Sequence, residues 1–194
     1  MPTGDYAGIV QCLRTSVSDY WSGELNTVID QPVILNPRER DVPTACRGGL
    51  TLAPAFTCPP NNTVYLNKSL FALIEGHFTA EEVPYAMALV MSHEFGHVVQ
   101  AAVHEPGYAD TTSKAVSQRI EQQADCLSGV WARQESGRRR LDSGKYVEVA
   151  GAFIADISSN PEIATHGTPP QRVAAINRGL KNGRPKDCAL ATFS

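Results

Sequence analysis

The stretch VMSHEFGHVVQ, residues 90–100, places two histidines four positions apart in an otherwise apolar sequence. The apolar pattern begins near Pro84, a residue suited to a first helical turn, and predicts one helix that ends near Ala102. Residues four apart on a helix are offset by only about 40°, so His93 and His97 point the same way and can share one metal ion. Because neutral imidazole nitrogens bind zinc well, the sequence predicts a helix with two metal ligands on one face.

Glu94 follows the first histidine directly and is rotated away from the face that the two histidines share. This position suits a base that takes a proton from a metal-bound water better than it suits a third ligand. Gly96 costs about 1 kcal/mol of helix stability relative to Ala, which indicates that space matters beside His97. The alternative is that the histidines are only partly buried and that Glu94 is a surface carboxylate.

A catalytic zinc ion takes three protein ligands, so a further ligand must come from elsewhere in the chain. The extended motif H-E-x-x-H-x-x-G-x-x-H fails here, because Val103 stands where the last histidine belongs and His104 misses the position by one residue. A helix expected over 112–137 offers Glu121 and Asp125 on one face. We therefore expect Glu121 to bind the metal and Asp125 to accept the N–H of a ligating histidine. The alternative is an ordinary acidic face on a solvated helix.

The composition excludes several other classes of protein. The chain has 194 residues, of which 42% are hydrophobic and 19% charged, as is typical of globular proteins. A net charge of −3 argues against nucleic acid or an anionic membrane surface as a partner. No apolar run approaches the roughly 18 residues that cross a bilayer. We expect one domain over residues 1–194, in which residues 1–55 form a helix and loop region packed on the remainder.

Five cysteines bear on the compartment of the protein. Cys46 and Cys58 bracket a Pro- and Gly-rich loop, so we expect a disulfide between them, and Cys188 in the tail can pair with Cys126. Cys12 has no evident partner. These pairings favour an extracytoplasmic protein, secreted or formerly anchored to a membrane, although no signal peptide is visible. In a cytoplasmic, reducing compartment the same residues would be buried or spare thiols.

The other expected elements are mainly helical. The last helix opens with Thr168 and Gln171 at the two positions of a capping box. The rest of the segment 31–60 is Pro- and Gly-rich and is assigned no element beyond one strand. Further helices are expected over 5–22, 68–76, 112–137 and 143–159, and short strands over 32–35 and 62–67.

Three motifs occur in a fixed order along the chain: SHEFGHVVQ (92–100), EQQADCLSGVW (121–131) and HGTPPQRVAAINRG (166–179). With FTCPPNNTVYLNKSLF upstream and the terminal KDC, they resemble the bacterial neutral zinc metallopeptidases over about residues 56–193. That family belongs to the glutamate-ligand zinc peptidases, or gluzincins. The resemblance implies a compact, predominantly helical α+β fold. In it, a small sheet containing residues 62–67 would lie over the active-site helix, and its edge strand would pair with an extended peptide.

The resemblance also implies a role for each residue of the site. His93, His97 and Glu121 would bind one Zn²⁺ per chain, Glu94 would be the catalytic base, and Asp125 would be the partner of His93. The expected function is a zinc-dependent endopeptidase that hydrolyses peptide bonds through a metal-bound water activated by Glu94. Its partner would be a peptide or protein substrate. The alternatives are a non-catalytic zinc-binding or peptide-binding domain at the cell surface, and an interaction module in which the motif is coincidental.

Two basic residues of the third motif are further candidates. His166 lies just before the last helix, and Arg172 lies one turn inside it. A tetrahedral intermediate develops an oxyanion, which a positioned His or Arg stabilises. We expect His166 to donate to this oxyanion, and Arg172 either to orient it or to pair with a carboxylate. Alternatively, both residues only anchor the loop to the last helix.

Overall fold

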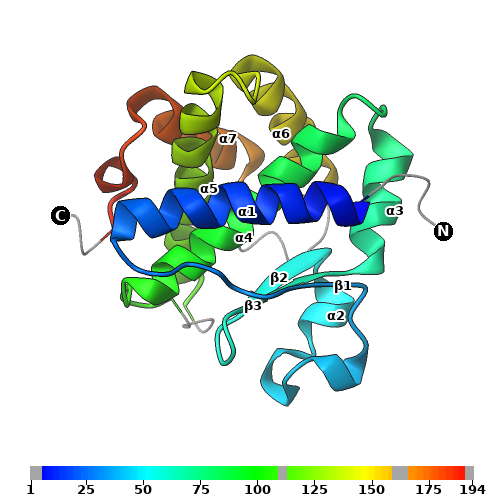
Figure 1. The fold of residues 1–194 in the computed structure, drawn as a ribbon. Coiled ribbons are helices and arrows are strands. Elements are labelled where there is room, and N and C mark those ends of the chain that lie inside the picture. The colour runs from blue at the N-terminus through cyan, green and yellow to red at the C-terminus, as the bar shows by residue number, and fades with distance from the viewer. Residues whose placement is uncertain (1–5, 109–112, 159–165, 191–194) are drawn as a thin grey trace.

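The computed structural model describes residues 6–108, 113–158 and 166–190 (Figure 1). Three predicted helix ends lie outside these ranges: the starts expected at residues 5 and 112 and the end expected at residue 159. The fold is predominantly helical α+β, as the sequence predicted. The helices are α1 (Tyr6–Leu25), α2 (Gly49–Leu52), α3 (Lys68–His77), α4 (Val83–Ala102), α5 (Lys114–Gly137), α6 (Ser143–Ile157) and α7 (Pro169–Asn182). Short 3-10 turns cover η1 (Glu39–Asp41), η2 (Thr44–Cys46) and η4 (Pro185–Cys188).

A three-stranded sheet lies against one side of the helices (Figure 1). The middle strand is β3 (Thr63–Leu66), which runs parallel to β1 (Val33–Leu35) and antiparallel to β2 (Ala55–Cys58). The predicted strand at 62–67 is therefore the centre of the sheet, and β1 and β2 are its edges. β2 was not predicted, because a four-residue strand in a Pro- and Gly-rich stretch carries too little pattern. It contacts α4, so the sheet covers the helix that carries the two histidines.

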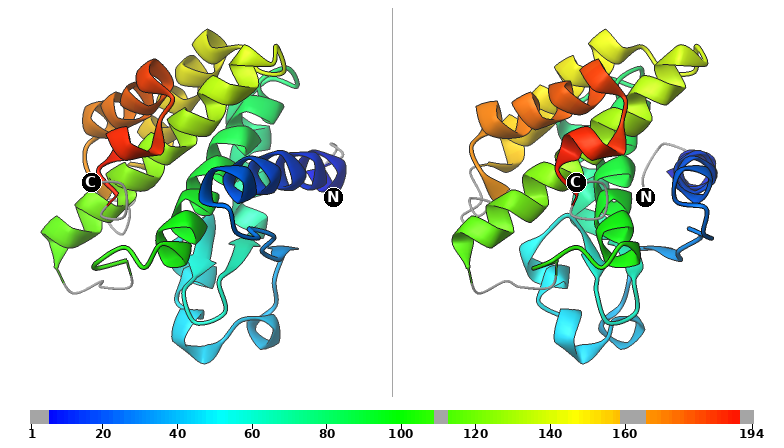
Figure 2. Two further views of the ribbon diagram at one scale, coloured as in Figure 1. Left: turned by 60° about the vertical axis from the view of Figure 1, so that its left-hand side comes forward. Right: turned by 90° about the vertical axis from the view of Figure 1, so that its left-hand side faces the viewer.

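Helix α4 is the centre of the molecule. It is contacted by α1, α5 and α6 as well as by β2, and Figure 2 shows α1 lying across it. Nearly every residue from Ala86 to Gln100 is buried, including Ser92, His93 and Glu94. Because α4 is buried on nearly all sides, each polar side chain in it needs a hydrogen-bond partner within the protein or in a bound ligand.

Two helix crossings are close because small residues meet there. A Cβ on Gly96 of α4 would lie 2.9 Å from the Ala124 Cα atom of α5, so only glycine fits at this contact. This agrees with the expectation that space matters beside His97. On the other side of α5, a Cβ on Gly129 or on Gly179 of α7 would overlap a backbone oxygen of the facing helix. The three helices α4, α5 and α7 are therefore held at short range.

The ends of the elements differ slightly from the prediction. α1 continues to Leu25, and α3 passes through Gly76, the expected stop, to end at His77. At the start of α7, Gln171 accepts a hydrogen bond from the backbone N–H of Thr168 at 2.9 Å, as a capping box requires. The positions of the helices are thus predictable from periodicity to within a few residues.

Two disulfides pair the cysteines as expected. Cys46 is bonded to Cys58 at the end of β2, and Cys126 of α5 is bonded to Cys188 of η4. Cys12 on α1 is an exposed free thiol. Such bonds are typical of proteins in oxidising compartments. Within the described residues, no helix is both long and apolar enough to cross a membrane.

Candidate metal centre

Helices α4 and α5 bring two histidines and one glutamate together. The ligand atoms offered by His93, His97 and Glu121 all lie within 4.8 Å of one another. Glu121 Oε2 is 3.1 Å from His93 Nε2 and 3.5 Å from His97 Nε2. The two imidazole rings are almost perpendicular, with an interplanar angle of 88°. Both Nε2 atoms therefore face the same carboxylate oxygen, and each ring leaves its Nδ1 atom for another partner.

The three side chains fit a zinc ion by their chemistry. Two imidazole nitrogens and one carboxylate oxygen are ligands that zinc prefers, and three protein ligands are the number found in catalytic sites. The side chains of His93, His97 and Glu121 are 10%, 12% and 14% exposed, so the group is largely buried but still reached by solvent. His104, which the sequence excluded as a ligand, is an exposed loop residue.

His93 is held by a charged partner. Its Nδ1 atom lies 2.9 Å from Oδ1 of Asp125, which is completely buried. Arg172 of α7 donates to both carboxylate oxygens of Asp125, at 2.8 and 2.9 Å. A buried carboxylate is costly unless it is paired and hydrogen-bonded, and this bidentate contact supplies the pairing. Of the two roles expected for Arg172, the structure therefore shows the pairing with a carboxylate.

The pKa values of this cluster follow from its charges. Burial lowers the pKa of His93, but the Asp125 and Glu121 carboxylates outweigh burial and raise it to about 10. Burial raises the pKa of Asp125, but Arg172 and His93 outweigh it and lower the value to about 2. Burial also raises the pKa of Glu121, but His166 and the other histidines hold it well below its usual value. Both carboxylates are therefore ionised at neutral pH, as metal binding requires.

His97 is held by a neutral partner that the sequence analysis missed. Its Nδ1 atom lies 2.8 Å from Oε1 of Gln100. The Gln100 amide nitrogen donates to the Ile120 carbonyl oxygen and to Gln123 Oε1, each at 2.8 Å. Gln100 is completely buried. Residues three apart on a helix are neighbours, so the spacing of His97 and Gln100 was the signal from which this contact could have been predicted.

Glu94 is buried beside the ligands and is held by the sheet. The hydroxyl of Thr57 on β2 lies 2.8 Å from Glu94 Oε2 and 3.1 Å from the Glu94 carbonyl oxygen. Oε1, the other carboxylate oxygen, makes no hydrogen bond to any described residue. Thr57 was missed by the sequence analysis, because its position depends on how β2 pairs with β3 and packs on α4.

Two cavities meet at His93 and Glu94. The larger has a volume of about 270 Å³ and the smaller about 60 Å³. The larger also borders His97, Glu121 and His166, and its outer walls are Phe56, Pro59, Tyr108 and Ile120. The smaller also borders His166 and Arg172. The rest of its lining is apolar: Ala53, Pro54, Ala55, Leu89, Val90, Phe153 and Ile157. The site is therefore a groove with space on both sides of Glu94.

Two further polar groups border the larger cavity. His166 Nε2 lies 3.2 Å from Glu121 Oε2, and burial lowers the pKa of His166 despite the raising effect of Glu121. The hydroxyl of Tyr108 is buried without a hydrogen-bond partner among the described residues, and its ring centroid is 6.3 Å from that of His97. An unpaired buried hydroxyl in a cavity is a group that a ligand can satisfy. Tyr108 lies in an irregular loop, where no sequence pattern indicated it.

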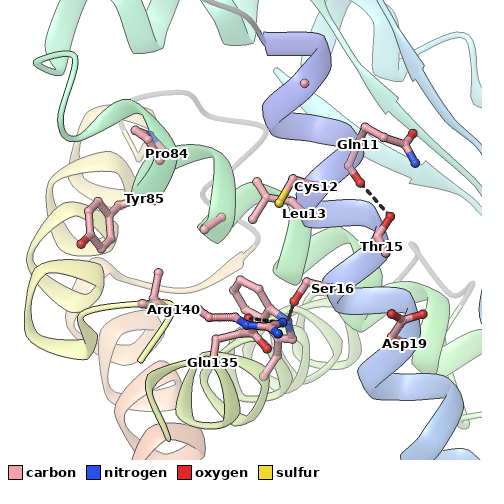
Figure 3. Close-up of a pocket in the computed structure, with 14 residues that line it drawn as sticks. Gln11, Cys12, Leu13, Thr15, Ser16, Asp19, Pro84, Tyr85, Glu135 and Arg140 are labelled. Carbon is pink, nitrogen blue, oxygen red and sulfur yellow. Dashed lines mark hydrogen bonds and ion pairs between the residues drawn. The ribbon is translucent and has the colours of Figure 1, made fainter. Parts of the chain in front are cut away.

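A larger cavity lies elsewhere, between α1, α4 and α5 (Figure 3). Its volume is about 690 Å³, and its lining includes Cys12, Trp131, Glu135 and Arg140. The Glu135 carboxylate is 3.9 Å from an Arg140 guanidinium nitrogen. No residue of the histidine and glutamate cluster lines this groove, so it is separate from the metal centre.

Comparison with protein families agrees with this arrangement of fold and site. Residues 8–193 match the family model described as "Putative neutral zinc metallopeptidase". The chain therefore belongs to the neutral zinc metallopeptidase family, as its motifs predicted. No solved structure matches the chain.

Curated relatives are found in distant bacteria. The chain is 30% identical to the "Uncharacterized protein YpfJ" of Escherichia coli K12 over 163 residues, which are 75% of this chain and 56% of the relative. It is 30% identical to the "Uncharacterized protein Rv2575" of Mycobacterium tuberculosis H37Rv over 176 residues, which are 79% of this chain and 59% of that relative. The chain thus spans less than two thirds of the length of these relatives.

Proposed function

We propose that this protein is a zinc-dependent endopeptidase in which His93, His97 and Glu121 bind one Zn²⁺ and Glu94 is the catalytic base. The observation that carries the proposal is the convergence of two imidazole nitrogens and a carboxylate oxygen beside the Glu94 carboxylate, whose Oε1 atom makes no hydrogen bond to a described residue. When bound, zinc supplies a Lewis acid that makes a water more acidic and polarises a peptide carbonyl. The protein groups around it then have to move one proton and stabilise one negative charge.

Glu94 moves the proton in this proposal. Thr57 donates to Glu94 Oε2, so the rotation of the carboxylate is fixed and Oε1 is left to face the groove. Oε1 accepts a proton from the attacking water and returns it to the amine that leaves when the peptide bond breaks. A buried carboxylate suits this exchange because few other waters compete for its oxygen.

His166 and Tyr108 stabilise the charge that develops on the peptide oxygen. Both border the larger cavity. Since burial lowers the pKa of His166, its imidazole is neutral at pH 7 and can donate one N–H. Tyr108 has a buried hydroxyl that makes no hydrogen bond to a described residue, so it is available as a second donor.

An extended peptide fits the groove beside β2. This strand is an edge of the sheet, and its residues Ala55, Phe56 and Thr57 border the cavities at Glu94. Edge strands bind peptides by adding a further strand through main-chain hydrogen bonds. The Cys46–Cys58 disulfide fixes the end of β2 and so supports its position.

The compartment and the extent of the functional unit belong to the same proposal. The two disulfides support an extracytoplasmic protein. We propose that residues 1–194 form a single peptidase domain, with α1 packed on α4. The relatives are considerably longer, so this domain would supply the peptidase activity within a larger protein in such cases.

The decisive experiment compares Glu94→Gln with the unchanged protein in a peptide-library cleavage assay. The variant should retain about one zinc per chain and lose cleavage by roughly 10²- to 10⁴-fold, the usual contribution of a general base. Glu81→Gln makes the same chemical change at an exposed glutamate and should leave cleavage unchanged. A zinc-containing protein that cleaves no peptide would instead indicate a non-catalytic zinc-binding domain, and unchanged turnover in Glu94→Gln would refute the base.

A further inference from the structure

The two glutamines behind His97 fix the direction of the hydrogen bond that His97 makes. The Gln100 amide nitrogen lies between two acceptors, the Ile120 carbonyl oxygen and Gln123 Oε1, each at 2.8 Å. If this amide were flipped, an oxygen would face two other oxygens. Gln100 Oε1 must therefore face His97 Nδ1, and in the neutral ring the proton lies on Nδ1. His97 Nε2 is consequently left without a proton, as a metal ligand must be.

Gln123 extends this support to the C-terminal segment. Its amide nitrogen donates to the carbonyl oxygen of Ala189 at 2.9 Å, and its side-chain oxygen accepts from Gln100. Gln123 is 3% exposed, so water does not replace either bond easily. A continuous path of three hydrogen bonds therefore joins His97 to the backbone of the tail.

Ala189 is held in an unfavourable backbone conformation. Its φ angle is 56° and its ψ angle 37°, in the left-handed region that residues with a Cβ seldom occupy. Such a conformation persists only where the neighbouring structure holds it. Here the preceding residue, Cys188, is bonded to Cys126 of α5, and the following residue, Leu190, is completely buried. The disulfide thus helps to hold the carbonyl oxygen that anchors the path.

We propose that Gln100 and Gln123 are positioning residues for His97, and that through them the Cys126–Cys188 disulfide strengthens zinc binding at a site that it does not touch. The inference rests on the proposed zinc site. Breaking the disulfide lets Ala189 relax, which withdraws the acceptor of Gln123 and loosens the orientation of Gln100. The His97 ring then spends less time in the orientation and tautomer that direct the Nε2 lone pair at the metal.

The test measures the dissociation constant of Zn²⁺ by competition with a chromophoric chelator. Gln100→Met should weaken zinc binding by about 10- to 100-fold, as is typical when the hydrogen-bond partner of a ligand is lost. Gln123→Met should weaken it less, and so should the Cys126→Ser/Cys188→Ser double variant. Gln134→Met, on α5 but away from the site, is the matched control and should bind zinc as the unchanged protein does.

The pathway itself is tested by combining the changes. If the disulfide acts through Gln123, removing it in the Gln123→Met protein should cause no further loss of zinc affinity. If the two changes instead weaken zinc binding independently, the fold losses of affinity multiply in the combined variant, and the proposed coupling is overturned. A Gln100→Met protein that binds zinc within twofold of the unchanged protein would overturn the positioning role alone. An unchanged protein that takes up no zinc would overturn the proposed function together with this inference.

A second measurement uses no variant and so stays decisive if a substitution prevents folding. Long-range ¹H–¹⁵N spectra of the zinc-loaded protein report which ring nitrogen of His97 carries the proton and how fast that proton exchanges with water. We expect a proton on Nδ1 that exchanges slowly, because the buried Gln100 Oε1 atom accepts it. A proton on Nδ1 that exchanges as fast as that of an exposed histidine would overturn the positioning role of Gln100. A proton on Nε2, or rapid exchange between the two nitrogens, would overturn the inference.

Discussion

The two histidines of α4 face the same carboxylate oxygen of Glu121 but are held by partners of different charge. His93 faces Asp125, a buried carboxylate that Arg172 of α7 neutralises. His97 faces Gln100, a neutral amide held by Gln123. The first support is ionic and depends on a third helix, while the second carries no charge and ends at the disulfide-bonded tail.

The difference is explained by the cost of burying charge. A carboxylate partner orients a ligating imidazole and raises its basicity, but each buried carboxylate needs a cation. Arg172 is buried, and among the described residues Asp125 is the carboxylate to which it donates. A second carboxylate behind His97 would need a second cation in the same core. An amide fixes the tautomer of His97 without this requirement, so the site combines one charged and one neutral support.

The largest expected effect comes from breaking the ionic support with Asp125→Asn. This change leaves the Arg172 guanidinium buried without its anion, which typically costs 3–5 kcal/mol, so we expect a loss of about 4 kcal/mol in the free energy of unfolding. Zinc affinity should fall by about 10- to 100-fold. Chemical denaturation with a chelator present measures the first effect, and chelator competition the second. Asp19→Asn, at an exposed position, is the control. A loss below about 1 kcal/mol would contradict the ionic support.

The second effect concerns pH, because only the ionic support titrates in acid. The pKa of Asp125 is about 2 in the folded protein and about 3.9 in an unfolded chain, so its ionisation stabilises the fold above pH 4. This contribution, about 2–3 kcal/mol, should disappear as the pH falls through about 2. The stability difference between the unchanged protein and Asp125→Asn should therefore shrink between pH 5 and pH 2. The difference between the unchanged protein and Gln100→Met should stay flat, and a parallel decline would contradict the comparison.

The smallest effect is expected from the neutral support in the zinc-free protein. Gln100→Met leaves the Ile120 carbonyl oxygen and the His97 Nδ1 atom without their partner, which should cost about 1–3 kcal/mol. Denaturation in the presence of a chelator measures this cost, with Gln134→Met as the reference. A cost equal to that of Asp125→Asn would show that the two supports do not differ in the way their charges imply.

The helices and the residues on their faces were predictable because helical spacing is a local property. His93, His97, Glu121 and Asp125 follow from two pairs spaced four apart, and their meeting requires only that α4 and α5 pack together. Local spacing also places Gln100 beside His97, because the two residues are three positions apart on one helix. In general, periodicity shows on which face of its own helix or strand a side chain lies. It does not identify the residue that this side chain contacts on another element.

The residues that escaped prediction depend on distant parts of the chain. Thr57 reaches Glu94 only because β2 pairs with β3 and lies against α4. Gln123 meets the tail because the chain after α7 returns to α5, where the Cys126–Cys188 disulfide joins the two segments. Arg172 reaches Asp125 only because α7 packs closely on α5. Each of these contacts joins residues tens of positions apart, which periodicity does not detect.

The contact between Gly96 and Ala124 also limits how the sequence around the site can vary. Neither residue offers a ligand atom, yet a methyl group on Gly96 would collide with the α5 backbone and move Glu121 away from the histidines. The two positions are therefore coupled: a larger residue at either one is tolerated only if the helices shift together. A substitution at either position is expected to disturb the ligand cluster through the spacing of α4 and α5, although neither residue carries a ligand atom.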